Sequence, residues 1–213
     1  MSLFQQGSIR YAGPFYRLQT AIHYRAQAPT ELSIIATDKN TSMAKKYFAV
    51  TMDGLYELLF ESNKIERHCY EIIEDKCSAK LYYDLEMKCP ESQDFTETQS
   101  RHFLELIVDT LVKFVHFALG AVCQPIVLQS CSPQKFSLHI IFPTVILDTH
   151  MFSARYLVEC SRLYVNDRFQ KMIINEEGTQ ELRQMIDRAL NVGLIDDSVY
   201  KRHQLYRMVG NTK

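Results

Sequence analysis

The sequence predicts a fold of the α+β class, in which a sheet is interrupted by a helical excursion. Two runs rich in strand-forming residues, 68–73 and 79–87, precede a long amphipathic helical pattern, and two further strand patterns, 125–130 and 136–142, follow it. Two more helical patterns then come before a strand-like tail that begins at residue 195. This order is typical of a mixed α+β sheet rather than of alternating βαβ units.

The long helix has a recognisable start, face and end. Thr96 and Gln99 resemble a capping box, and Gly120 is a typical residue at a helix end. Its predicted apolar face consists of Phe103, Leu104, Ile107, Val108, Leu111, Val115 and Ala118.

Three other helices are predicted. One begins at Met52, and another follows Asp148, whose side chain is placed to cap it. The last spans about residues 179–191 and ends near Gly193.

The composition is that of a soluble globular protein, with 213 residues of which 46% are hydrophobic and 23% are charged. The net charge of −1 argues against a basic nucleic-acid-binding surface over the whole chain, although only basic charges follow Asp197. No apolar run is long enough to span a bilayer, so we expect no membrane partner. Six cysteines without CxxC or zinc-ligand spacing indicate reduced thiols in an intracellular compartment.

Two carboxylates, Asp84 and Glu86, lie two residues apart in the predicted strand KLYYDLEM. Residues at this spacing on a strand share a face, so their like charges lie close together. A divalent cation such as Mg²⁺ or Mn²⁺ would neutralise them and leave room for phosphate oxygens. The alternative is an edge strand whose acids simply face water.

A second polar face is predicted in KFSLHIIF, where Lys135, Ser137 and His139 alternate with apolar residues. Together these side chains supply donors for phosphate oxygens. The alternative is the ordinary polar side of a half-exposed strand. A third segment, from Leu194 to Lys213, begins with two acids after an apolar pair and ends basic. One of its acids could complete the metal site begun by Asp84 and Glu86, and its basic residues could hold a triphosphate. The alternative is a surface hairpin of mixed charge.

The order of these three segments resembles the archaeo-eukaryotic primase superfamily, in particular its primase-polymerase branch. HCYEIIEDKCSAKLYYDLEMKCP is similar to the first motif of that branch, SPQKFSLHIIF to the second and IDDSVYKRHQLYRMVGNTK to the third. The third segment is also similar to the primase domains of large DNA viruses that are fused to a helicase. Weaker similarity extends upstream to about His23.

The resemblance implies a role for individual residues. Asp84, Glu86 and Asp196 would be catalytic and would hold two divalent ions, Mg²⁺ or Mn²⁺. Asp196 is preferred over Asp197 because it follows an apolar residue, as the family acid does. The implied nucleotide-binding residues are Lys46, Lys135, Ser137, His139, Arg207 and Lys213, and the implied template contacts are Arg25 and Gln27.

The fold implied by the resemblance is two interleaved modules within a catalytic core of residues 1–213. An RRM-like catalytic sheet would comprise residues 76–144 and 193–213, and an N-terminal α/β module would comprise residues 1–75 and 145–192. The family fold continues through further strands, so the resemblance predicts the core of a longer protein. Gln204 stands where relatives carry a basic residue, and no Cys/His zinc module of the kind that supports primer initiation follows.

The implied function is two-metal transfer of dNTPs or NTPs to a primer on a single-stranded DNA template. Such an enzyme would serve DNA replication, damage tolerance or translesion synthesis, in the nucleus, the mitochondrion or a viral replication site. A helicase or a single-strand-binding protein would be its partner. Two alternatives stay open: a catalytically idle, RRM-like module that binds single-stranded nucleic acid, and a metal-dependent nuclease using the same carboxylates.

Overall fold

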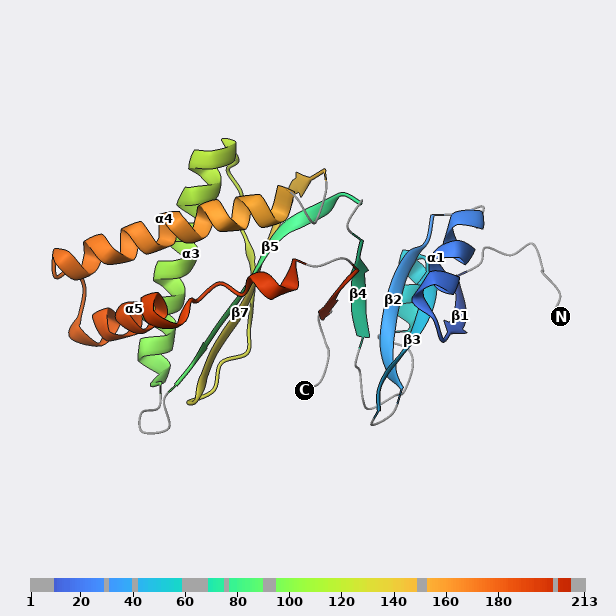
Figure 1. Cartoon of the computed structure of the whole chain (residues 1–213), viewed down its shortest axis with the longest axis horizontal. Helices are drawn as coiled ribbons and strands as arrows, with labels where there is room; N and C mark the ends of the chain where they lie inside the picture. Colours follow the sequence, from blue (N-terminus) through green and yellow to red (C-terminus); the bar gives the residue numbers. More distant parts are fainter. Residues whose placement is uncertain are drawn as a thin grey trace. The chain divides into compact units, whose positions relative to one another are not determined.

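A computed structural model describes most of the chain and divides it into two compact units (Figure 1). One unit consists of Met1–Glu74 with His203–Lys213, and the other of Asp75–Arg202. The described residues are 10–28, 31–39, 42–58, 69–74, 77–89, 95–148, 153–200 and 203–207.

The first unit contains a five-stranded antiparallel sheet in the order β1-β3-β2-β4-β8. Its strands are β1 (Tyr11–Phe15), β2 (Ser33–Lys39), β3 (Ser42–Val50), β4 (Cys69–Ile73) and β8 (Gln204–Arg207). Helices α1 (Leu18–Gln27) and α2 (Met52–Tyr56) accompany it. Ala21 of α1 packs with Ile34 and Ala49 in a buried apolar cluster on this sheet.

The sequence predicted β4 and a strand in the tail, but it did not predict β1, α1, β2 or β3. The helix predicted from Met52 begins there as α2, which is followed by π-helical residues 57–58, and the rest of the predicted helix lies outside the described residues. Thr51 caps α2, since its hydroxyl accepts a hydrogen bond from the Gly54 N–H at 3.1 Å.

The second unit contains a three-stranded antiparallel sheet in the order β5-β7-β6. The strands are β5 (Ala79–Lys88), β6 (Ile126–Gln129) and β7 (Lys135–Leu147). Its helices are α3 (Glu97–Leu119), α4 (Arg155–Ile174) and α5 (Gln180–Val192), followed by a 3₁₀ helix, Asp197–Val199. The α+β class predicted from the sequence is confirmed.

Helix α3 forms as its sequence predicts. Thr96 and Gln99 make both hydrogen bonds of the capping box, and Gly120 ends the helix in the left-handed conformation, with φ 64°. The Phe103 ring packs edge-on against Phe136 of β7 at 5.1 Å and lies 5.8 Å from Phe169 of α4. The apolar side of the sheet is therefore covered by helices (Figure 1).

Helix α4 begins differently from the prediction. Its N-cap is Ala154, which makes no side-chain capping bond, so Asp148 is not the cap. Helices α4 and α5, which fall within residues 145–192, lie in the same unit as β5 and β7, because both contact α3.

No helix in the described ranges combines the length and the apolar character that crossing a membrane requires. The six cysteines all fall within these ranges, and each is a free thiol.

Candidate active site

Strands β5 and β7 each have one buried and one polar face. In β5 the side chains of Leu85 and Met87 are buried, whereas those of Asp84 and Glu86 are partly exposed. In β7 the same alternation sets Phe136, Leu138 and Ile140 into the core and turns Lys135 and His139 toward the polar side. The predicted alternation is confirmed for these residues, whereas Ser137 and Tyr82 are buried although they lie on the polar faces of β7 and β5.

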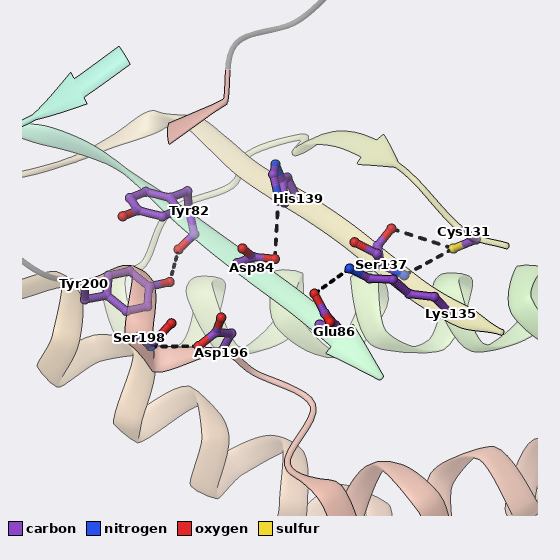
Figure 2. Close-up of polar contacts among 10 residues, drawn as sticks. All are labelled: Tyr82, Asp84, Glu86, Cys131, Lys135, Ser137, His139, Asp196, Ser198 and Tyr200. Carbon is purple, nitrogen blue, oxygen red and sulfur yellow. Dashed lines mark hydrogen bonds and ion pairs between the residues drawn. The ribbon is translucent and has the colours of Figure 1, made fainter. Parts of the chain in front are cut away.

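The register of the two strands brings the predicted acids and bases together. Asp84 lies opposite His139 and Glu86 opposite Ser137. The Asp84 Oδ1 atom is 3.5 Å from His139 Nε2, and Lys135 reaches diagonally so that its Nζ is 2.6 Å from Glu86 Oε2 (Figure 2). Acids and bases that the sequence placed on two separate strands therefore form two cross-strand pairs.

Cys131 contacts the backbone of the second motif, which the sequence did not predict. The Ser137 N–H donates to Cys131 Sγ at 3.5 Å, and the thiol donates to the Ser137 carbonyl oxygen at 3.7 Å (Figure 2). The Ser130 N–H donates to the same carbonyl at 2.9 Å. These contacts fix the backbone of Ser137, which lies between Lys135 and His139 on the same face of β7.

The third predicted acid reaches the site through the backbone. Ile195 forms an isolated antiparallel bridge with Leu85, which places Asp196 beside Asp84. The Asp196 N–H donates to the Asp84 carbonyl oxygen at 2.9 Å, and the Glu86 N–H donates to the Leu194 carbonyl oxygen at 3.0 Å. The segment therefore lies along the edge of β5, with Asp84 and Asp196 on neighbouring backbone (Figure 2).

The next acid in the chain, Asp197, has a different environment. Its Oδ2 atom accepts a hydrogen bond from Arg162 Nη2 of α4 at 3.2 Å. The Asp196 carboxylate instead accepts from the Ser198 N–H at 2.8 Å and caps the 3₁₀ helix. Asp196 therefore adjoins Asp84 through its backbone, whereas the Asp197 carboxylate pairs with α4.

Asp84, Glu86 and Asp196 fit a divalent cation in their chemistry and in their backbone placement. Carboxylate oxygens are the donors that Mg²⁺ and Mn²⁺ prefer, and all three residues lie at one edge of one sheet. Their side chains do not converge, however, since each turns to the partner given above. In the part of the chain that the structure describes, no three His, Cys, Asp or Glu side chains form a group that could hold a metal ion.

The remaining predicted site residues belong to the first unit or lie outside the described residues. Lys46 is in β3, Arg25 and Gln27 are in α1, and Arg207 is the last residue of β8. Lys213 lies outside the described residues. Asp84 and Glu86, by contrast, belong to the second unit.

Arg25 and Gln27 both contact neighbours within their own unit. The Arg25 guanidinium makes a two-pronged ion pair with the Glu74 carboxylate, in which Nη2 lies 3.1 Å from Oε2. The Gln27 Nε2 atom is 3.1 Å from His23 Nε2. Glu74 carried no signal in the sequence, because 49 residues separate it from its partner.

Two tyrosines that link β5 to the segment carrying Asp196 were also missed. The Tyr82 hydroxyl donates to the Val199 carbonyl oxygen at 3.0 Å, and the Tyr200 hydroxyl donates to the Tyr82 carbonyl oxygen. Tyr82 shares the strand face of Asp84 and Glu86, two residues before Asp84, and this spacing was the available signal.

Tyr83, the neighbour of Tyr82, points to the opposite, apolar face of β5. Its ring packs edge-on against Phe142 at 6.0 Å, and burial raises the pKa of its hydroxyl well above the usual value. Among the described residues this hydroxyl has no hydrogen-bond partner of normal geometry, although the Ser161 hydroxyl lies near it and acts to lower the pKa.

Comparison with known proteins points to one group. No family model matches the chain. The human DNA-directed primase/polymerase protein is 24% identical over 131 residues, and its chicken counterpart is 27% identical over 133 residues. Each match covers 60% of this chain and 23% of the relative. A putative primase of Ostreid herpesvirus 1 is 21% identical over 193 residues, which are 84% of this chain and 16% of the viral protein.

This chain resembles the primase-polymerases. The comparisons confirm the resemblance that the three motifs predicted, in both its cellular and its viral form. The matched stretch spans about a quarter of the length of the human and chicken relatives.

Proposed function

We propose that this chain is the catalytic core of a DNA primase/polymerase, a nucleotidyltransferase that adds dNTPs or NTPs on a single-stranded DNA template. The observation that carries the proposal is the site on β5 and β7, where Asp84 and Glu86 face His139 and Lys135 across one strand pair. Similarity to the human and chicken primase/polymerase proteins supports the same reaction.

Asp84, Glu86 and Asp196 would hold the divalent ions. When bound, these ions would neutralise the triphosphate and activate the 3′-hydroxyl of the primer. The register supports this role, because it places two acids on one strand face and the third on the adjoining backbone. The bases on β7 complete the arrangement by lying directly beside the acids.

Lys135, Ser137 and His139 would bind the phosphates of the incoming nucleotide. In the structure the Lys135 ammonium lies against Glu86 and offsets its negative charge, and His139 Nε2 lies 3.5 Å from Asp84 Oδ1. Binding of cation and nucleotide would exchange these pairs, so that each acid contacts the cation and each base contacts a phosphate oxygen.

Lys46, Arg207 and Lys213 are proposed as further phosphate contacts, and Arg25 and Gln27 as template contacts. Contacts of this kind to a nucleic-acid backbone are salt-dependent and largely blind to sequence. To contact the template, Arg25 would first have to break its bidentate ion pair with Glu74.

The test is extension of a labelled primer on single-stranded DNA with dNTPs and either Mn²⁺ or Mg²⁺. The double substitution Asp84→Asn and Glu86→Gln keeps the shape of both side chains and removes their charges. We expect it to reduce extension by at least about a thousandfold, equivalent to about 4 kcal/mol of lost transition-state stabilisation. Circular dichroism should show an unchanged fold, because both carboxylates are partly exposed.

A matched control removes two acids elsewhere in the same unit. Asp109 and Asp167 each pair with a lysine one helical turn later, at 2.7 and 2.6 Å, on the surfaces of α3 and α4. The double substitution Asp109→Asn and Asp167→Asn should leave extension within about twofold of the wild type, since exposed pairs contribute little. Full extension by the Asp84/Glu86 variant would refute the metal assignment.

One observation supports the alternative that the chain is a catalytically idle module that binds single-stranded nucleic acid. In the described part of the chain, the three carboxylates do not converge on a common point. A sheet with a polar face can bind single strands without catalysis. Single-strand binding that is indifferent to Mn²⁺, together with no extension by the wild type, would favour this alternative. Shortening of the labelled DNA would instead reveal a nuclease.

A further inference from the structure

The segment Leu194–Tyr200, which carries Asp196, is attached to β5 at two places. Near its start, Ile195 bridges to Leu85 and two backbone hydrogen bonds flank this bridge. At its end, Tyr200 stacks on Tyr82, with ring centroids 5.1 Å apart and ring planes inclined by 27°. Asp196 lies between the two attachments, so its backbone is held on both sides.

Tyr82 and Tyr200, here called the tyrosine clamp, make reciprocal hydrogen bonds. The Tyr82 hydroxyl donates to the carbonyl of Val199, and the Tyr200 hydroxyl donates to the carbonyl of Tyr82 (Figure 2 shows the second bond). Each tyrosine therefore links β5 to the segment Leu194–Tyr200. Both side chains are buried, with 2% and 3% of their surface exposed. A buried phenol and a buried carbonyl both need a partner, so loss of either bond would loosen the segment.

Tyr83, the next residue of β5, is also a buried tyrosine, but its hydroxyl does not link β5 to this segment. Tyr83 is fully buried on the apolar face, and within the described residues its hydroxyl makes no hydrogen bond of normal geometry. The clamp differs because its two hydroxyls link β5 and the segment that carries the third acid, one from each side. Packing alone does not account for this reciprocal arrangement.

We propose that the tyrosine clamp positions Asp196 beside Asp84, so that a divalent cation can be shared between β5 and the segment Leu194–Tyr200. Tyr82 and Tyr200 are positioning residues, since they act through the backbone and not on the reacting atoms. The inference rests on the proposed function, because it takes Asp196 as a metal-binding acid. Arg162 adds a third restraint through Asp197.

The experiment compares three Tyr→Phe variants of the full chain: Tyr82→Phe, Tyr200→Phe and Tyr83→Phe. The first two keep the stacked rings and remove one hydrogen bond of the clamp each. Mn²⁺ affinity is measured directly, by titration calorimetry or by electron paramagnetic resonance of the free ion. We expect each clamp variant to bind Mn²⁺ about fivefold more weakly, the equivalent of one lost hydrogen bond, while the matched Tyr83→Phe control is unchanged.

The metal dependence of primer extension distinguishes the positioning of Asp196 by the clamp from a purely structural role of the two tyrosines. The clamp variants should need about fivefold more Mn²⁺ for half-maximal rate and should recover nearly full kcat, with unchanged KM for dNTP, at saturating Mn²⁺. Tyr200→Leu, which also removes the stacked ring, should show a larger shift that Tyr200→Phe partly rescues. Unchanged Mn²⁺ affinity in both Tyr82→Phe and Tyr200→Phe would overturn the inference.

The result also separates the inference from the proposed function. If the wild type extends primers and the clamp variants bind Mn²⁺ normally, the clamp inference fails and the proposed function stands. If the clamp variants bind Mn²⁺ more weakly but the wild type extends no primer, the positioning role stands and the proposed function fails. A wild type that binds no Mn²⁺ would overturn both.

Discussion

The substitution Lys135→Met should strengthen the binding of divalent cations while weakening the binding of nucleotide. The Lys135 ammonium lies 2.6 Å from Glu86 and competes with any cation for that carboxylate. Removing the ammonium leaves Glu86 unpaired beside Asp84 on the same strand face, which increases the local negative charge. The nucleotide loses one charged contact to its phosphates at the same time.

The size of the effect follows from the exposure of the pair. Coulomb attraction at 2.6 Å is about 6 kcal/mol at an effective dielectric of about 20, but the two side chains are 34% and 37% exposed. Solvent therefore screens the pair, and a contribution of about 1 kcal/mol is more realistic. This corresponds to an increase of about fivefold in Mn²⁺ affinity. Loss of a charged hydrogen bond should weaken dNTP binding by about tenfold or more.

The assay titrates Mn²⁺ into the protein without nucleotide, and then titrates dNTP at saturating Mn²⁺. Lys80→Met is the matched control, because Lys80 is an exposed lysine on β5, the strand of Glu86, and its removal changes the net charge equally. The control should alter both affinities by less than about twofold. Mn²⁺ affinity that is unchanged or lower in Lys135→Met would refute the reasoning.

Two further predictions concern single residues of the second unit. Asp196→Asn should lower primer extension by about a hundredfold or more. Asp197→Asn should stay within about threefold of the wild type, because the Asp197 carboxylate pairs with Arg162. A larger loss of extension in Asp197→Asn than in Asp196→Asn would instead make Asp197 the metal-binding acid. Tyr83 ionises near pH 10.0 in the unfolded chain, but burial raises its pKa in the folded chain. The folded state therefore binds more protons above about pH 10, and the free energy of unfolding falls as the pH rises. Tyr83→Phe should remove up to about 1.4 kcal/mol per pH unit of this fall in urea denaturation, and equal slopes would contradict the sign.

Local features of the sequence were sufficient for several elements. The capping box at Thr96 and the glycine after α3 depend on residues within one helical turn, so they can be recognised without knowledge of the fold. The alternation along β5 and β7 likewise follows from the twofold period of a strand, which is why Asp84 and Glu86 could be assigned to one face.

The N-terminal half of the first sheet was not recognised from the sequence. Strands β2 and β3 pair with each other, and their stability depends on packing of Ile34, Ala36 and Ala49 against Ala21 of α1. Strand propensity depends strongly on such neighbours, and a single short stretch of sequence does not carry this information.

The sequence by itself determined which residues share a face, because strand and helix periods are properties of adjacent residues. Only the tertiary structure determined which strands and helices pack against each other, and in which register. It set the register that pairs Lys135 with Glu86 across 49 residues, and it laid Asp196 on the edge of β5. It also joined Tyr82 to Tyr200, which lie 118 residues apart in the chain. Contacts of this range depend on how the whole unit packs, and local periodicity does not specify them.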